Sequence, residues 1–470
     1  MLAGLLALLA VLTVRSRFDD PDLWWHLKTG QIIWTTHSIP VTDLFSYTTG
    51  RHAWIPHEWL AQLVIYAAYQ WGGYSGLMLW LCFFTGAVLI AGYGLCALYS
   101  GNAKVAFLGA MAIWFFGAIG FSIRPQLIAY LFLIAELALI HLGRRRNPRW
   151  FFWLPALFAV WINCHPSFML GLIVAAVFLF SSLFNFRSGS LAAVPWDARC
   201  RGALALALVL SLAALFLNPV GIRQVLYPID TMLNMPLLLG NVEEYAPLNL
   251  GTASGAALLG VLLSSFLLAA TRKSELYFDE LLVLAAAAWL AVSHLRMLPV
   301  FGILAAPILC RQLATFWEVY KAEEDRVWPN ALMIGASLLA AWLAFPGRAN
   351  LEGQVEAQSP VKAVEFIQAS HLSGPMLNDH PFGGYLIWAA PQHPVFIDGR
   401  TDVFEWTGVL GEFGRWAMLQ DDPHALLDKY GIQFCLLTSH SPMVRVLPLM
   451  HDWKLVYSDD HAVVFARTAP

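Results

Sequence analysis

Hydrophobic positions along the chain form long apolar runs separated by short polar turns. A helix needs about 20 mostly apolar residues to cross a bilayer, and most of the runs approach that length. They cover residues 2–14, 74–99, 104–122, 126–142, 150–164, 167–185, 202–217, 253–271, 277–293, 297–313 and 329–345. The pattern predicts a polytopic α-helical membrane protein with about eleven transmembrane helices.

The first polar segment, residues 18–57, carries acidic and histidine side chains among tryptophans. Tryptophan favours the membrane–water interface, because its ring is apolar while its N–H seeks water. We therefore expect this first outer loop to lie on a membrane surface. Residues 58–71 predict a helix too short to span, which ends at Gly72-Gly73.

From about Arg348 the apolar runs shrink to strand length, in PVFID, FCLLT, KLVYS and AVVFA. Helical patterns alternate with them, in PVKAVEFIQAS, EWTGVLGEFGRWAML and HALLDKYG. Alternating strand and helix signals predict a small α/β domain at 348–470, following a transmembrane domain at 1–347. The C-terminal domain holds 8 Lys+Arg and 14 Asp+Glu, a balance of −6.

The composition of the whole chain supports a membrane protein. The chain is 59% hydrophobic and 13% charged, with a mean hydropathy of +0.61, whereas soluble domains carry about 25% charged residues. No basic cluster is interleaved with aromatic residues, so nucleic-acid binding is excluded. The six cysteines show no CxxC spacing and indicate neither a disulfide framework nor a zinc site.

Lys and Arg in the turns predict the orientation. With the N-terminus inside, the cytoplasmic turns hold Lys104, Arg144, Arg145, Arg146, Arg149, Arg187, Arg199, Arg201, Arg272, Lys273, Arg311, Lys321 and Arg326. The outer turns between helices hold only Arg124, Arg223 and Arg296. This is the positive-inside asymmetry, and it places the C-terminal domain outside.

Polar residues at the outer ends of the runs are the candidate site. They are Asp20, Asp22, His57, Glu58, Arg124, Asn163, His165, Asn218, Glu243, Glu244, His294 and Arg296. A turn is the better explanation for Asn218-Pro219, because Asn-Pro is a turn signal. For Asn163 and His165, packing and a functional role explain the sequence equally well. One Asp of D-P-D can cap the helix beginning near Leu23, which leaves the other carboxylates without a structural reason.

These residue types share a chemical logic. A carboxylate on the outer face can act as a general base or bind a divalent cation. Arginine and histidine nearby can hold a phosphate. Together they suit displacement of a lipid-linked phosphate leaving group, with the lipid held by the apolar helices.

The N-terminal loop resembles a known superfamily. FDDPD followed by aromatic residues is similar to the F-D-P motif that opens the first outer loop of oligosaccharyltransferases, members of the GT-C membrane glycosyltransferases. More closely, the chain resembles a group of bacterial membrane proteins that has no assigned reaction. The shared blocks include DPDLWWHLKTG, HEWLAQ, RPQLIAY, WINCHPSFMLG, LNPVG, RMLPVFGILAAP and GGYLIW…VFIDGRTDVF. The sequon-reading WWD motif of oligosaccharyltransferases is absent from the sequence, which argues against peptide glycosylation.

The resemblance implies inverting transfer of a sugar from a polyprenyl-phosphate donor to a glycan, lipid or protein acceptor at the outer face of the bacterial inner membrane. It maps the family's base or metal-binding Asp onto Asp20, with Asp22 as the second candidate. From the residue types on the outer face we add Glu58 as a further catalytic carboxylate, and Arg124, His165 and Arg296 as ligands of the donor phosphate. Candidate substrate contacts are His26, His57, Glu243, Glu244, Asp398 and Arg400, although a salt-bridged turn explains Asp398 and Arg400 at least as well. A divalent cation, Mg²⁺ or Mn²⁺, would be held by Asp20 and Glu244.

Two other functions remain open. Transporters place ionisable groups near the membrane midplane and often show repeats. Here Glu136 is the one charge well inside an apolar run, and no internal repeat is evident. A non-catalytic membrane scaffold, with a partner-binding C-terminal domain, is the third possibility. The outer-face charges argue against it.

Overall fold

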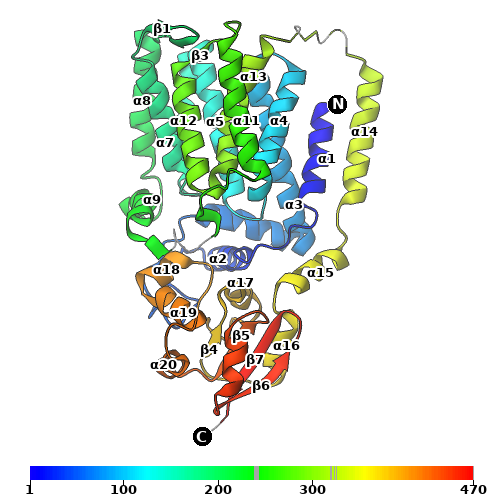
Figure 1. Ribbon diagram of the computed structural model, residues 1–470, viewed down its shortest axis with the longest axis vertical. Helices are drawn as coiled ribbons and strands as arrows, with labels where there is room; N and C mark the ends of the chain where they lie inside the picture. Colours follow the sequence, from blue (N-terminus) through cyan, green and yellow to red (C-terminus); the bar gives the residue numbers. More distant parts are fainter. Residues whose placement is uncertain (238–242, 318–319, 322, 324, 469–470) are drawn as a thin grey trace. The chain divides into compact units, whose positions relative to one another are not determined.

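The computed structural model describes residues 1–237, 243–317, 320–321, 323 and 325–468 (Figure 1). The chain divides into two compact units. Unit 1 comprises residues 1–15, 80–228 and 241–345, and unit 2 comprises residues 16–79, 229–240 and 346–470. The first polar loop thus belongs to the same unit as the C-terminal α/β segment.

Unit 1 is a bundle of apolar helices, and each predicted run contains one. The helices are α1 Leu2–Val14, the second part of α3 Trp59–Ser100, α4 Ala103–Gly117, α5 Gln126–Arg145, α6 Leu154–Trp161, α7 Phe168–Ser181, α8 Ala198–Ala214, α11 Ala253–Ala270, α12 Phe278–Ser293, α13 Leu298–Ala314 and α14 Val327–Ala344; α9 Ile222–Asn234 follows α8. Among the described residues, six helical stretches are long and apolar enough to cross a membrane. The protein is therefore a multi-pass membrane protein, while the exact count of spans stays a prediction.

The helices pack closely because small residues let neighbouring side chains approach. Gly109 of α4 lies against the sulfurs of Cys96 and Cys310, and Gly302 of α13 lies against Phe116. Helix α13 is the most buried of the six, with 72% of its apolar window inside the protein. Helix α14 has only 6% inside, so its apolar surface is available to lipid.

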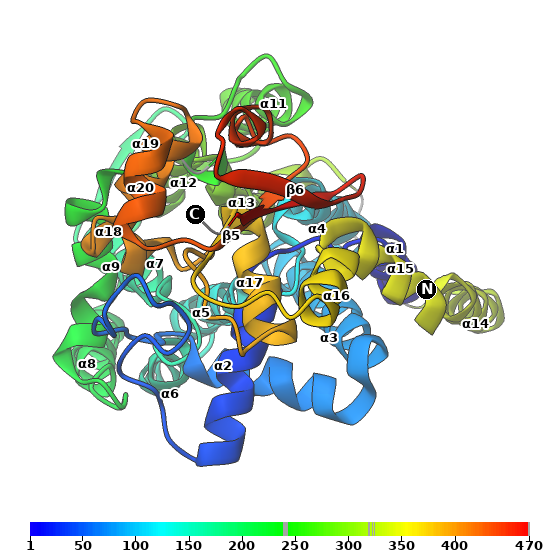
Figure 2. The same cartoon turned by 90° about the horizontal axis from the view of Figure 1, so that it is seen from below.

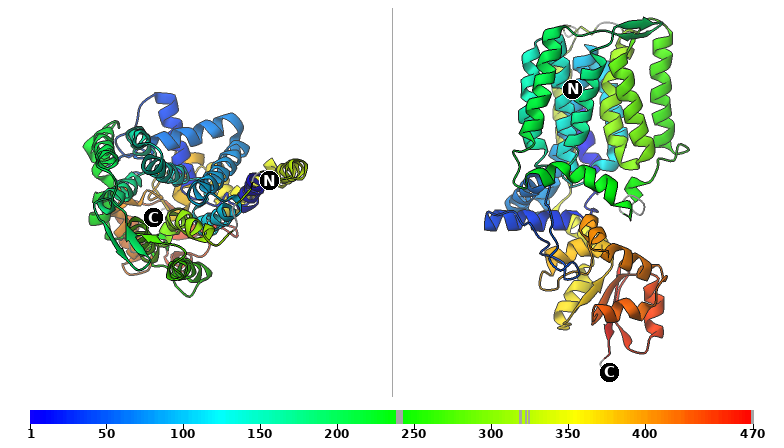
Figure 3. Two further views of the ribbon diagram at one scale, coloured as in Figure 1. Left: turned by 90° about the horizontal axis from the view of Figure 1, so that it is seen from above. Right: turned by 90° about the vertical axis from the view of Figure 1, so that its left-hand side faces the viewer.

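Unit 1 has two chemically different ends. At one end, strands β1 Phe186–Ser188, β2 Leu191–Ala193 and β3 Leu276–Tyr277 form a small sheet (Figures 1 and 3). Arg144, Arg187 and Arg311, predicted to share one membrane side, pair at that end with Asp279, Glu275 and Glu280. At the other end, the short 3₁₀ helices η3 Glu243–Tyr245 and η4 Leu295–Met297 are joined by a hydrogen bond from the Leu295 N–H to the Ala246 carbonyl.

Unit 2 is built around a four-stranded sheet. The strands are β4 Met376–Asn378, β5 Phe434–Thr438, β6 Trp453–Ser458 and β7 Ala462–Arg467, in the order β4-β5-β7-β6. β4 and β5 are parallel, and the other pairs are antiparallel. Helix α16 Val361–Ala369 lies on one side of the sheet, with α18 Thr401–Trp406, α19 Val409–Ala417 and α20 Pro423–Lys429 on the other (Figure 2).

The remaining helices of unit 2 come from both ends of the chain. They are α2 Leu23–Thr36 and the first part of α3, then α15 Arg348–Gln358, α17 His380–Ala389 and α21 Met443–Val446, which η6 Leu447–Leu449 follows. Helix α3 breaks at Gly72 and Gly73, as the sequence predicted, and Gly73 has a φ of +55° that favours glycine.

Two local predictions in unit 2 were wrong. PVFID is not a strand: Val395 makes only an isolated bridge with Ser46, and the Phe396 N–H is bound by the Asn378 side chain. Its backbone groups are satisfied by the first loop and by a side chain, so it does not join the sheet, whose first strand is β4. The EWTGVLGEFGRWAML helix divides at Gly408, whose φ of +80° separates α18 from α19.

Candidate functional site

The D-P-D sequence forms the start of helix α2, and its two aspartates have different contacts. Asp22 occupies the N-cap position but makes no capping hydrogen bond. Its carboxylate accepts from the indole N–H of Trp25 at 3.0 Å, and Asp20 accepts from the backbone N–H of Asp22 at 3.0 Å. Asp20 is 9% exposed. Asp20 therefore holds the first turn of α2 as an N-cap side chain does, whereas Asp22 holds the indole of Trp25, so capping accounts for one of the two carboxylates.

His26, His57 and Glu58, scattered over the predicted loop, come together in unit 2. The Glu58 carboxylate lies 3.8 Å from His26 Nδ1 and 4.0 Å from His57 Nε2. Gln62, one turn along α3, bonds His26 Nδ1 at 3.2 Å. Burial lowers the pKa of His57 to about 4, against a hydrogen bond to the Ile55 carbonyl that raises it. His57 is therefore neutral at pH 7, so its contact with Glu58 is not an ion pair.

Arg400 is held in a buried charge cluster with two aspartates. Its guanidinium donates to Asp43 at 2.6 Å and to both oxygens of Asp398 at 2.8 and 2.6 Å. The rings of Phe45 and Trp54 lie 4.7 and 4.8 Å from the guanidinium carbon. Burial acts to lower the pKa of Arg400, but the two carboxylates outweigh it and raise that pKa. Burial likewise acts to raise the pKa of Asp43, but Arg400 and hydrogen bonds from neighbouring groups lower it overall.

This cluster joins the first loop to the C-terminal segment. Arg400 is 2% exposed, and Asp43 and Asp398 are fully buried. Their burial and mutual pairing favour a structural role for Asp398 and Arg400 over the predicted substrate contact.

One glycine in each of the GGY and DGR motifs leaves room for the D-P-D loop. A side chain at Gly384 would meet the Pro21 carbonyl, and one at Gly399 would meet the Asp22 carboxylate. Trp24 also packs edge-on against Tyr385, with ring centroids 5.2 Å apart. The unusual C-terminal motifs therefore form the surface on which the D-P-D loop is held.

Unit 1 carries the second group of predicted residues, beyond the N-terminal ends of α5 and α13. Arg124 makes a two-oxygen ion pair with Glu244 at 3.0 and 3.2 Å. Arg296 lies over the ring of Tyr245, 4.5 Å from its centroid. Across the described part of the chain, Arg296 makes neither a hydrogen bond nor an ion pair, so its donors remain available. An arginine held by an aromatic ring with available donors can bind a phosphate.

The other predicted residues have local contacts. His165 shares a turn with Ser167: its Nδ1 lies 2.9 Å from that hydroxyl. Asn163 donates to the carbonyls of Ala159 and Leu217, which ties the turn after α6 to the segment after α8. Glu243 begins η3, and its side chain lies outside the described part of the structure.

Within the described residues, no group of three or more His, Cys, Asp or Glu is arranged to hold a metal ion. Asp20 belongs to unit 2 and Glu244 to unit 1, and their joint binding of a cation stays a prediction.

Three side chains were given no role in the site from the sequence. Asp43 completes the Arg400 cluster, Gln62 contacts His26, and Tyr245 holds Arg296. Each lies far along the chain from its partner. No motif or spacing in the sequence indicates these pairings.

Comparison with solved structures gives the fold. An Archaeoglobus fulgidus oligosaccharyltransferase tethered to an acceptor peptide with an NVT sequon matches with a TM-score of 0.54 and 11% identity, over 99% of this chain and 74% of that one. ArnT from Cupriavidus metallidurans, bound to undecaprenyl phosphate, matches with a TM-score of 0.54 and 13% identity, over 98% and 97%. The archaeal AglB in complex with an inhibitory peptide and dolichol-phosphate matches with a TM-score of 0.50 and 12% identity, over 92% and 69%.

The chain therefore shares the fold of these oligosaccharyltransferase and ArnT structures, in agreement with the fold that the resemblance of its N-terminal loop implied. No family model matches the sequence, and no curated protein matches it. At these identities the likeness concerns the fold, and residue roles rest on the geometry above.

Proposed function

We propose that this protein is an inverting GT-C-type glycosyltransferase, which moves a sugar from a polyprenyl-phosphate donor to a glycan, lipid or protein acceptor. The observation that carries the proposal is the fold match to ArnT bound to undecaprenyl phosphate, which extends over 98% of this chain. The reaction would take place at the outer face of the bacterial inner membrane, with residues 348–470 on that side, as the Lys and Arg distribution predicts.

In the proposed reaction the acceptor oxygen attacks the anomeric carbon, and the bond from that carbon to the phosphate oxygen breaks. The acceptor proton passes to Asp20, and the phosphate leaves with the bonding electrons. Asp20 suits the role because its carboxylate is held by the Asp22 N–H yet retains 9% exposure. Asp22, which accepts from the indole of Trp25, and Glu58, which lies near two histidines, are the other candidate bases.

Arg296 and Arg124 would bind the donor phosphate. Arg296 is the stronger candidate, because its described contact is the Tyr245 ring, whereas Arg124 is paired with Glu244. A phosphate would have to compete with that carboxylate for Arg124. His165 is a third candidate, and His26, His57, Glu243 and Glu244 remain proposed substrate contacts.

Binding of undecaprenyl phosphate to the purified protein tests the phosphate assignment. We expect Arg296→Ala to weaken binding about tenfold or more, because a charge-assisted hydrogen bond is lost. Arg223→Ala is the matched control, since Arg223 is an exposed arginine predicted on the same membrane side. If wild-type protein does not retain undecaprenyl phosphate, or if the two variants behave alike, the assignment fails.

Asp20→Asn tests the base. Asparagine keeps an oxygen that accepts from the Asp22 N–H, so the turn should survive. Sugar transfer from radiolabelled polyprenyl-phosphate sugars in membranes should fall about 10²–10⁴-fold. Asp19→Asn, at the exposed neighbouring position, should leave transfer unchanged. Normal transfer by a folded Asp20→Asn protein would contradict the assignment and make Glu58 the next candidate.

A further inference from the structure

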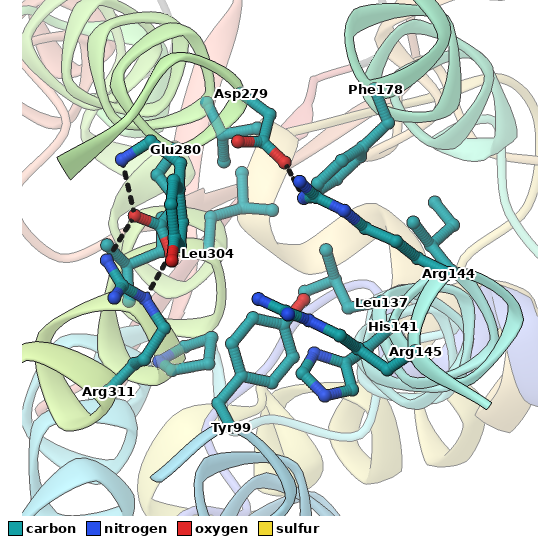
Figure 4. Close-up of a pocket in the computed structure, with 15 residues that line it drawn as sticks. Tyr99, Leu137, His141, Arg144, Arg145, Phe178, Asp279, Glu280, Leu304 and Arg311 are labelled. Atoms are coloured by element: carbon teal, nitrogen blue, oxygen red, sulfur yellow. Dashed lines mark hydrogen bonds and ion pairs between the residues drawn. The ribbon is translucent and has the colours of Figure 1, made fainter. Parts of the chain in front are cut away.

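A pocket lies at the end of unit 1 opposite the Arg124–Glu244 pair. It is lined by the last turns of α5 and α13 and the first turn of α12, with Tyr99 of α3 on another side (Figure 4). Arg124 precedes the first residue of α5, and the pocket lies at its other end. The helix has 20 residues, so its length is about 30 Å at 1.5 Å per residue. The pocket has a cavity volume of about 40 Å³, and it is partly open to solvent. The proposed transfer reaction does not use this pocket.

The acidic groups of the pocket are already neutralised. Asp279 pairs with Arg144 at 2.5 Å, and Glu280 accepts two hydrogen bonds from Arg311, each at 2.6 Å. Both carboxylate side chains are 7% exposed. Glu280 also accepts from the Tyr277 N–H at 3.0 Å, which fixes its position at the start of α12. These carboxylates are therefore not available to a cation from solution.

Arg145 supplies the surplus charge. Figure 4 shows its side chain reaching into the pocket beside Tyr99, with no dashed contact. Over the described part of the chain it forms no hydrogen bond or ion pair, although it is exposed at the end of α5. A guanidinium offers five donors in a planar fork, which matches a phosphate group. Three arginines and two carboxylates line the pocket, so it carries one net positive charge.

The deeper wall is apolar. Leu137, Phe178, Val283, Leu304 and Ile308 line it, all on helices of the bundle. A pocket with a cationic rim and an apolar wall is matched by an amphiphile whose phosphate lies beside apolar chains. Basic pockets between transmembrane helices on the cytoplasmic side bind anionic lipid head groups.

We propose that this pocket binds the phosphate of an anionic membrane phospholipid, with Arg145 as its main ligand. Tyr99 would offer a hydroxyl to the same phosphate, and Leu137 and Phe178 would contact the start of the acyl chains. The site is independent of the proposed glycosyl transfer, because it lies at the other end of the helices. The positive-inside pattern places it in the cytoplasmic leaflet.

Lipid retention in nanodiscs tests the site. Full-length protein is placed in nanodiscs of phosphatidylcholine containing a minor fraction of phosphatidylglycerol, and bound lipid is counted by native mass spectrometry after release. We expect wild-type protein to enrich phosphatidylglycerol, and Arg145→Gln to bind it about tenfold more weakly. Arg146→Gln is the matched control, because Arg146 is an exposed neighbour that does not line the pocket.

Three outcomes would overturn the proposal. Wild-type protein could show no preference for phosphatidylglycerol, or Arg145→Gln and Arg146→Gln could reduce its binding equally. Displacement of the lipid by millimolar inorganic phosphate, with no lipid preference remaining, would show a free-anion site instead of a lipid site. A thermal unfolding measurement on both variants should show that each remains folded, because both arginines are exposed and neither forms an ion pair with another described residue.

Discussion

Replacing Arg400 by methionine removes the centre of the buried cluster in unit 2. Methionine fills a similar volume and keeps apolar packing against Phe45 and Trp54, so the substitution mainly deletes the charge. It leaves Asp43 and Asp398 as carboxylates with no exposed surface and without their cation. Breaking a buried ion pair in this way typically costs about 3–5 kcal/mol. The equilibrium for opening unit 2 should therefore rise about 10²–10⁴-fold.

Cys435 reports that opening directly. It is fully buried in β5 and is the one cysteine of the sequence that falls within the ranges of unit 2. Its modification by a thiol reagent, followed by mass spectrometry of its peptide in the full-length protein, measures how often the sheet opens. Other cysteines lie in separate peptides and do not interfere. We expect Cys435 to react about 10²–10⁴ times faster in Arg400→Met than in wild-type protein.

Arg415→Met is the control. Arg415 pairs with Asp421 at 2.9 Å, but both side chains are about half exposed, and such pairs contribute about 0–1 kcal/mol. Its effect on Cys435 should stay below about tenfold. Adding Asp43→Asn and Asp398→Asn to Arg400→Met removes the unpaired charges and should recover part of the protection. If Cys435 reacts no faster in Arg400→Met than in Arg415→Met, the cluster does not stabilise unit 2.

Three further predictions concern orientation, pH and metal. A thiol reagent that does not cross membranes should label an introduced Gly353→Cys from outside intact cells and miss Asn147→Cys; the opposite pattern would reverse the proposed orientation. Unfolded His57 binds a proton below about pH 6.5, whereas in the fold its pKa is about 4, so stability should fall by up to about 3 kcal/mol as pH drops from 6.5 to 4. Thermal unfolding should show a smaller loss in His57→Gln over that window, and an equal loss would contradict the burial of this ring. Transfer activity should survive excess EDTA if Asp20 acts as a base, and loss of activity that Mg²⁺ or Mn²⁺ restores would favour the metal alternative.

Much of the architecture could be predicted from the sequence, because a bilayer leaves few choices. Backbone groups in hydrocarbon must be satisfied within their own segment, so each long apolar run forms a helix. Each run from 2–14 to 329–345 holds one. The break at Gly72-Gly73 was equally local, since glycine alone adopts such a backbone readily. Alternation of short apolar strands with helical patterns likewise predicted an α/β segment near the C-terminus.

The partners of individual side chains were decided only by the tertiary structure. Arg400 pairs with Asp43, 357 positions away, and no local pattern distinguishes Asp43 from other loop aspartates. PVFID has the composition of a strand, yet its backbone binds the first loop and Asn378. For DGR the sequence was consistent with a substrate site or a salt-bridged turn, and in the structure Asp398 pairs with Arg400 while Gly399 leaves room for Asp22. Periodicity along a chain determines which face of an element is apolar, but a buried charge is stabilised by whichever opposite charge the fold brings to it, and that depends on the packing of distant segments.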